Sequence, residues 1–189
     1  DRRLVGTARI CAYRDGPGRV RKVTRHARYT VGDREGRQDR APVPAIREAF
    51  EAAGIDAPEH GDVRVDLWEK FVLLTPFAAV TAGARCDAAT IAATPELMAL
   101  AETLARETIA VAEAQGIALP GDQLARTVEG IRGLPGEMRA SLAHDLAAGK
   151  PLETDWLSGA VARLGAEAGV ETPAHRTVAA LLAPWRHGV

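Results

Sequence analysis

The stretch from Leu67 to Arg85, LWEKFVLLTPFAAVTAGAR, constrains the fold of this chain more than any other. It is apolar on nearly every side apart from Glu69 and Lys70, so we expect about five turns of helix buried in a protein core. The charges at its start and the interior Pro76 argue against a membrane span. Because proline lacks a backbone N–H, we expect Pro76 to kink the helix near its middle.

Lys70 is the residue of this stretch with the clearest chemical potential. Its ammonium can extend past the start of the helix to solvent, as amphipathic lysines commonly do. Alternatively it lies at the rim of a cavity, where loss of water lowers its pKa and makes it a usable proton donor. The residues alone leave both interpretations open.

Charge and cysteine content exclude several classes of protein. The 189 residues include 24 Lys and Arg against 25 Asp and Glu, a balance that predicts neither nucleic-acid binding nor attraction to a membrane surface. Cys11, Cys86 and the five histidines show no spacing typical of a disulfide framework or a metal site, so we expect no metal. With no signal peptide or transmembrane run in the sequence, we expect a cytoplasmic protein.

The first 65 residues combine short strands with one helix, as in the last part of an α/β unit. The glycines at Gly16 and Gly18 predict a β-turn, because a dinucleotide-binding fingerprint would need a third glycine. An amphipathic helix over 41–54 ends at a glycine, and a turn with a short strand is expected over 55–66. The three other strands are expected at 4–13, 19–24 and 27–32.

Strand patterns disappear after residue 66. The best-marked helix, 94–115, begins with Thr94 and Pro95 and is followed by Gly116. With the Lys70 helix, a bundle of about six helices results, the others at 122–132, 136–148, 152–168 and 173–182. We therefore predict an α+β fold: a remnant of a Rossmann-type domain over 1–65 and an all-α bundle over 66–189. Because Asp1 opens inside a folded pattern without an initiator Met, we expect a fragment of a longer polypeptide.

Three stretches in this order resemble the C-terminal part of the ketopantoate reductase (2-dehydropantoate 2-reductase) family. They are Leu67-Trp68-Glu69-Lys70, then Ser141-Leu142-Ala143-His144-Asp145 with Glu153 eight residues later, then Gly159 and the turn with Gly169 and Thr172-Pro173. The resemblance covers nearly the whole chain. It implies a two-domain enzyme of the pantothenate pathway, in which a Rossmann domain binds NADPH through GxGxxG. The second domain is then a helical bundle like the C-terminal domain of 6-phosphogluconate dehydrogenase, and a homodimer is possible.

The resemblance also implies roles for three side chains. Lys70 corresponds to the lysine that protonates the substrate oxygen while NADPH reduces a 2-oxo acid to a 2-hydroxy acid. Ser141 corresponds to the serine that hydrogen-bonds the substrate carboxylate, and Glu153 to a glutamate that contacts the cofactor. Because the sequence contains no GxGxxG, we expect the chain alone to be inactive and unable to bind the cofactor.

Four positions depart from the family pattern. Leu74 and Ala78 stand where the family usually presents asparagines to the substrate, and Ala88 and Met138 replace two further polar residues. These changes predict a less polar pocket, suited to another 2-oxo acid or a bulkier apolar ketone.

An alternative from another class is a non-catalytic helical module for dimerisation or ligand binding, in which Lys70 only extends to solvent. A bundle from a different Rossmann-linked dehydrogenase is disfavoured by the position of the lysine at the start of the first interdomain helix.

Overall fold

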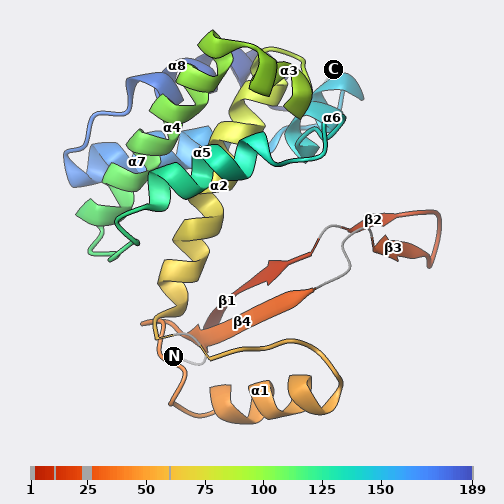
Figure 1. The fold of residues 1–189 in the computed structure, drawn as a ribbon, viewed down its shortest axis with the longest axis vertical. Coiled ribbons are helices and arrows are strands. Elements are labelled where there is room, and N and C mark those ends of the chain that lie inside the picture. Colours follow the sequence, from red (N-terminus) through yellow and green to blue (C-terminus); the bar gives the residue numbers. More distant parts are fainter. Residues whose placement is uncertain (1–2, 11, 23–26, 60, 189) are drawn as a thin grey trace. The chain divides into compact units, whose positions relative to one another are not determined.

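The computed structural model describes residues 3–10, 12–22, 27–59 and 61–188; Cys11, His26 and His60 lie outside these ranges. The chain forms two compact units, Asp1–Leu67 and Trp68–Val189, and the division falls inside the long helix α2, Val63–Gly83 (Figure 1). The first unit holds the strands and helix α1, and the remaining helices belong to the second. Strands followed by a helical bundle confirm the predicted α+β fold.

Two short antiparallel ladders make up the strands of the first unit. Strand β1, Leu4–Arg9, pairs with β4, Arg28–Asp33, and sets Thr7 opposite Thr30. Strands β2, Ala12–Arg14, and β3, Val20–Lys22, form a hairpin. Its turn has positive φ at both Gly16 and Gly18 and is closed by the Asp15 N–H, which donates to the Arg19 carbonyl at 2.9 Å. The predicted β-turn is confirmed.

Helix α1, Val43–Ala52, ends as its sequence predicted. Gly54 takes a φ of +70°, and the Ile55 N–H donates to the Phe50 carbonyl at 2.9 Å, which closes a glycine-dependent C-terminal turn. The strand predicted within 55–66 is wrong. Asp56 forms only an isolated bridge with Arg28, and helix α2 already begins at Val63.

The physical reason for the early start of α2 is a capping carboxylate. Asp62 Oδ1 accepts a hydrogen bond of 2.9 Å from the Arg64 N–H, and the Val65 N–H donates to the Asp62 carbonyl at 3.0 Å. These bonds satisfy backbone donors that a first helical turn would leave unpaired. The cap therefore overrides the strand preference of the β-branched residues that follow it.

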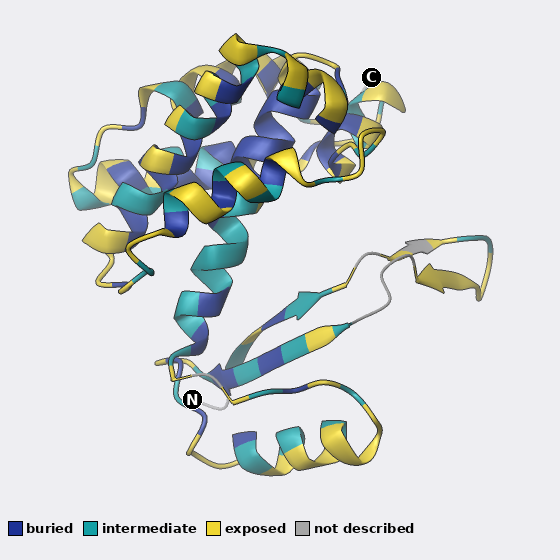
Figure 2. Cartoon of the chain, in the orientation of Figure 1, coloured by how far each residue is buried: buried dark blue, intermediate teal, exposed yellow. Residues whose placement is uncertain are grey.

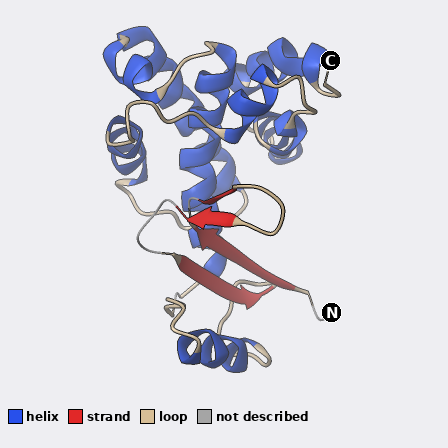
Figure 3. Ribbon diagram, turned by 90° about the vertical axis from the view of Figure 1, so that its right-hand side faces the viewer, coloured by secondary structure: helices blue, strands red, loops and turns tan. Residues whose placement is uncertain are grey.

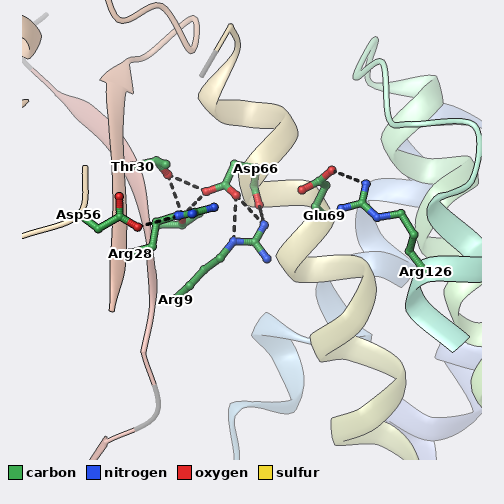
Figure 4. A network of polar contacts seen from close by, with 8 residues as sticks. Arg9, Arg28, Thr30, Asp56, Asp66, Glu69 and Arg126 are labelled. Carbon is green, nitrogen blue, oxygen red and sulfur yellow. Dashed lines mark hydrogen bonds and ion pairs between the residues drawn. The ribbon is translucent and has the colours of Figure 1, made fainter. Parts of the chain in front are cut away.

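A buried carboxylate joins α2 to the β1–β4 ladder within the first unit (Figure 4). Asp66, only 2% exposed, accepts hydrogen bonds from the hydroxyls of Thr7 and Thr30, the latter at 2.6 Å. Arg9 donates to its other oxygen from Nε at 2.9 Å and from Nη2 at 2.5 Å. Burial alone would raise the pKa of Asp66, but these bonds outweigh burial and hold it below its ordinary value.

Seven further helical segments complete the second unit (Figure 3). The helix over Pro173–Leu182 has the predicted bounds, and the helix predicted over 94–115 is shorter by one residue at each end. The segments are α3 Ala88–Ala93, α4 Pro95–Ala114, α5 Gln123–Arg132, α6 Ser141–Ala147, α7 Ser158–Ala168 and α8 Pro173–Leu182, with 3₁₀ turns η1 Glu153–Trp156 and η2 Ala183–Trp185.

Three details of the bundle differ from the sequence prediction. Helix α3 was not predicted; it is capped by Asp87, whose side chain accepts from the Thr90 N–H at 2.9 Å. Helix α6 begins only at Ser141. The helix predicted over 152–168 is divided at Leu157, whose backbone (φ −108°, ψ −103°) is not helical.

Burial along α2 changes abruptly at Thr75. All residues from Thr75 to Ala82 are buried, whereas Leu67–Phe71 and Leu73 are half-buried and Leu74 is 37% exposed (Figure 2). The prediction of burial on every side is therefore right only for the second half of the helix. The helix continues through Pro76, and Thr75 Oγ1 donates to the Phe71 carbonyl at 3.0 Å.

A chain of buried polar groups ties three helices of the bundle together. Thr75 Oγ1 on α2 lies 3.1 Å from Thr108 Oγ1 on α4, and Thr108 Oγ1 lies 2.9 Å from Nε2 of His175 on α8. Glu107 on α4 accepts hydrogen bonds from the backbone N–H groups of Ala174 and His175 at 2.8 and 3.0 Å. A carboxylate from one helix thus caps the N-terminus of another.

Within the described ranges, no helix is long and apolar enough to cross a bilayer. The same residues contain no group of three His, Cys, Asp or Glu side chains arranged to hold a metal ion. Cys86 is free and buried.

Candidate active site around Lys70

Lys70 lies on α2 shortly before the helix becomes fully buried, and its side chain is half-buried. The preceding residue, Glu69, accepts a hydrogen bond of 3.3 Å from Arg126 on α5 (Figure 4). Trp68 and Phe71 pack edge to face, with ring centroids 5.6 Å apart. Lys70 is therefore flanked by groups that fix this turn of the helix while its own position stays close to solvent.

Close packing against α5 fixes the next turn. A Cβ added to Gly130 on α5 would lie 3.3 Å from Leu73 Cδ1, so only a glycine lets the two helices approach this closely. Leu74 and Ala78 follow Lys70 by one and two turns and share its face of the helix. Leu74 is 37% exposed, whereas Ala78 is 1% exposed and belongs to the core. The accessible part of the Lys70 face thus ends between these two residues.

The structure places Ser141 at the first turn of α6 and leaves its side chain exposed. Glu153 is the first residue of η1 and is also exposed. Neither side chain forms a hydrogen bond or ion pair with the rest of the described chain. Both groups are therefore accessible to a ligand, and neither is consumed by a structural role.

The three predicted site residues come from α2, α6 and η1, all in the second unit. Neither Ser141 nor Glu153 hydrogen-bonds Lys70 within the described ranges. A pocket lined by both α6 and α2 involves Thr81 and Arg85, near the C-terminal end of α2. Thr81 lies about 17 Å beyond Lys70 along the helix axis, at about 1.5 Å per residue.

The structure also accounts for the glycines of the family pattern. A Cβ on Gly159 would lie 3.0 Å from the Thr154 carbonyl oxygen, so this glycine lets α7 begin directly against η1. Gly169 takes a φ of +72° and ends α7. These glycines fix the backbone that carries Glu153 and need no further role.

Sequence reasoning missed one polar feature of this unit. Arg85 and Arg139 line the pocket at the end of α2, and they are far apart in the sequence. Only the positive φ of Arg85, at +53°, marks it as unusual, and no local sequence pattern reveals that angle.

Comparison with known proteins identifies the family. A family model described as the ketopantoate reductase PanE/ApbA C terminal matches residues 62–185. A 2-dehydropantoate 2-reductase of Mesorhizobium japonicum is 32% identical over 168 residues, 89% of this chain and 50% of that protein. The enzyme of that name from Halobacterium salinarum is 29% identical over 182 residues, 95% of this chain and 58% of that protein.

A solved structure supports the same relationship at the level of the fold. The crystal structure of 2-dehydropantoate 2-reductase from Methylococcus capsulatus superimposes with a TM-score of 0.83 at 29% identity, covering 96% of this chain and 62% of that one. The chain thus spans about half the length of the relatives it matches in sequence. The match over residues 62–185 shows that this chain belongs to the ketopantoate reductase PanE/ApbA family and carries its C-terminal domain.

Proposed function

We propose that the protein to which this chain belongs reduces a 2-oxo acid to a 2-hydroxy acid with NADPH. The family match over residues 62–185, which includes Lys70, Ser141 and Glu153, carries the proposal. Because the chain spans about half the length of its relatives, the activity is proposed for the whole protein.

Lys70 acts as the general acid. Its half-buried ammonium donates a proton to the carbonyl oxygen of the substrate as that oxygen becomes a hydroxyl. The positive charge also stabilises the negative charge that develops on the oxygen. A positioned acid of this kind accelerates a reaction by about 10²–10⁴-fold.

Ser141 and Glu153 bind the two reactants. The exposed Ser141 hydroxyl donates a hydrogen bond to the substrate carboxylate. The exposed Glu153 carboxylate, which has no partner among the described residues, fits a cofactor because it can accept a hydrogen bond from a sugar hydroxyl. NADPH, when bound, supplies the hydride. The glycine-rich pyrophosphate loop is not part of this sequence.

The apolar residue next to Lys70 sets the substrate class. Leu74 is one turn away on the same face, and its exposed side chain presents hydrocarbon where an asparagine would present an amide. A substrate hydroxyl placed there would lose its hydrogen-bond partner at a cost of about 1–3 kcal/mol. We therefore propose a 2-oxo acid with an apolar side chain in preference to ketopantoate.

The decisive experiment measures NADPH oxidation by the whole protein over a panel of 2-oxo acids that includes ketopantoate. Lys70→Ala is expected to lower turnover at least a hundredfold on the best substrate, since it removes both charge and proton. Lys70→Arg keeps the charge but is a poor acid, and is expected to stay at least tenfold slow. Lys150→Ala is the matched control, because Lys150 is an exposed lysine of the same unit, 3.7 Å from Asp145.

Exposure of Leu74 also supports a second candidate function, a non-catalytic module that binds an apolar ligand or a second copy of the chain. If no 2-oxo acid is reduced, or if Lys70→Ala leaves turnover unchanged, the reductase proposal fails and this candidate replaces it.

A further inference from the structure

A second pocket of about 200 Å³ lies at the other end of α2, against α6. Two of its lining residues are arginines and none is acidic, so positive charge is the only formal charge at its wall. The rest of the lining is small or apolar, and the complete set is Thr81, Ala82, Arg85, Arg139, Ala143, Leu146 and Ala147.

The backbone of Arg85 is strained in a way that its side chain does not require. After α2 ends, the Cys86 N–H donates to the Thr81 carbonyl at 3.2 Å, and Arg85 within this turn has a φ of +53°. Glycine normally occupies this position of a helix-ending turn, because an L side chain is disfavoured there. An arginine kept at a site where glycine would fold more easily suggests that its guanidinium has a task.

Neither arginine is committed to a structural contact. Within the described residues, the guanidinium groups of Arg85 and Arg139 form no hydrogen bond and no ion pair. The nearby carboxylate, Asp87, already accepts two bonds from Thr90, at 2.9 Å from the backbone N–H and 2.7 Å from the hydroxyl. The pKa of Asp87 is lowered mainly by the backbone bond from Thr90, and the charge of Arg139 contributes less.

The chemistry of the lining defines a ligand. Arginine recognises carboxylates through parallel N–H bonds, and the alkyl surface of Ala143, Leu146 and Ala147 offers a place for a hydrocarbon group. The volume suits about seven non-hydrogen atoms if each takes about the 30 Å³ of a water molecule. The negative end of the α2 dipole opposes an anion here, so binding must depend on both arginines.

We propose that this pocket binds a small aliphatic carboxylate, with its oxygens at Arg85 and Arg139 and its alkyl group against Ala143 and Leu146. The site is separate from the Lys70 site, and its test needs no catalytic turnover. It therefore stands or falls independently of the reductase proposal.

The test is an NMR titration of the ¹⁵N-labelled chain with isovalerate, with its neutral isostere isovaleramide, and with inorganic phosphate. Isovalerate is expected to shift the amide signals of Ala143 and Ala147, and the other two probes are expected to have at least tenfold weaker effects. Arg139→Gln and Arg85→Gly should each raise the dissociation constant for isovalerate at least tenfold. Arg132→Gln, which changes an exposed arginine outside the pocket, should leave it unchanged.

Two further variants keep the test decisive. Arg85→Gly should unfold at the same temperature as the parent or higher, so its loss of binding cannot be attributed to misfolding. Ser141→Ala should bind isovalerate normally, which separates this pocket from the proposed substrate site. Binding that is lost in Ser141→Ala, that survives both arginine changes or that isovaleramide shares would overturn the proposal. Phosphate binding as tight as that of isovalerate would overturn the choice of an aliphatic carboxylate.

Discussion

Acidification from pH 7 to pH 5 should destabilise this protein through one residue, His175. Its side chain is 0% exposed, and Nε2 lies 3.0 Å from the Leu104 carbonyl oxygen. Because a carbonyl can only accept, Nε2 carries the proton of the neutral ring. Nδ1 has no hydrogen-bond partner within the described chain. Protonation would therefore place a new N–H donor and a positive charge in the core with no acceptor to receive them.

The magnitude follows from the pKa. Burial lowers the pKa of His175 from 6.5 to about 4, and the bond to Leu104 offsets burial only in part. A histidine whose folded pKa is depressed contributes its full stability above pH 6.5 and loses it as the pH falls toward 4. That gap corresponds to about 3 kcal/mol at about 1.4 kcal/mol per pKa unit. By linkage, about 2 kcal/mol of it is lost between pH 7 and pH 5.

The measurement is urea unfolding followed by circular dichroism at pH 7, 6 and 5. We expect the free energy of unfolding to fall by about 2 kcal/mol across this range. His175→Gln removes the titrating group, so its free energy of unfolding should be lower at pH 7 but nearly constant down to pH 5. His144→Gln changes an exposed histidine of α6 and should keep the parental pH dependence.

The pH window separates His175 from the carboxylates. The pKa of Asp66 is held below its ordinary value of 3.8, so the stability it contributes is lost only below about that pH. If the parent loses less than about 0.5 kcal/mol by pH 5, or if His175→Gln falls as steeply as the parent, the assignment to His175 is refuted.

Two further stability predictions follow from the same unfolding assay. Asp66→Ala should cost about 2–3 kcal/mol, since it leaves Arg9 and two hydroxyls without their acceptor, whereas Asp56→Ala removes an exposed pair and should cost under about 1 kcal/mol. Equal losses would show that burial of the carboxylate does not matter. Ala78→Asn should cost about 2–5 kcal/mol because an amide enters the core, and Leu74→Asn under about 1 kcal/mol because Leu74 is 37% exposed. The reverse order would contradict the burial pattern of α2.

Local signals were enough to predict most of the bundle. Thr94 and Pro95 at one end and Gly116 at the other bracket α4, and Pro173 marks the start of α8. Helix α3 has only six residues, too few to show a helical period, although Asp87 is a recognisable cap. Termini with capping residues were therefore predictable, and short or interrupted helices were not.

Contacts between distant parts of the sequence were beyond local reasoning. Asp66 is bonded to Thr7 and Thr30, which lie 59 and 36 residues away, and nothing around Asp66 announces those partners. The roles proposed for Lys70 and Glu153 came from the resemblance to a family, because single residues on helices carry no spacing signal. The structure adds their exposure and the exposure of Leu74, and the roles themselves stay predictions.

The core of the bundle explains why α2 can present a lysine at a defined position. Thr75, buried and five residues after Lys70, is joined through Thr108 to His175, so α2 is fixed to α4 and α8 directly below the accessible part of its face. A helix held only by apolar contacts could slide or rotate at small cost, whereas a buried polar chain loses its bonds when displaced. Protonation of His175 would weaken this link one and a half turns from Lys70. The group that makes the fold sensitive to acid thus also holds the proposed catalytic lysine in place.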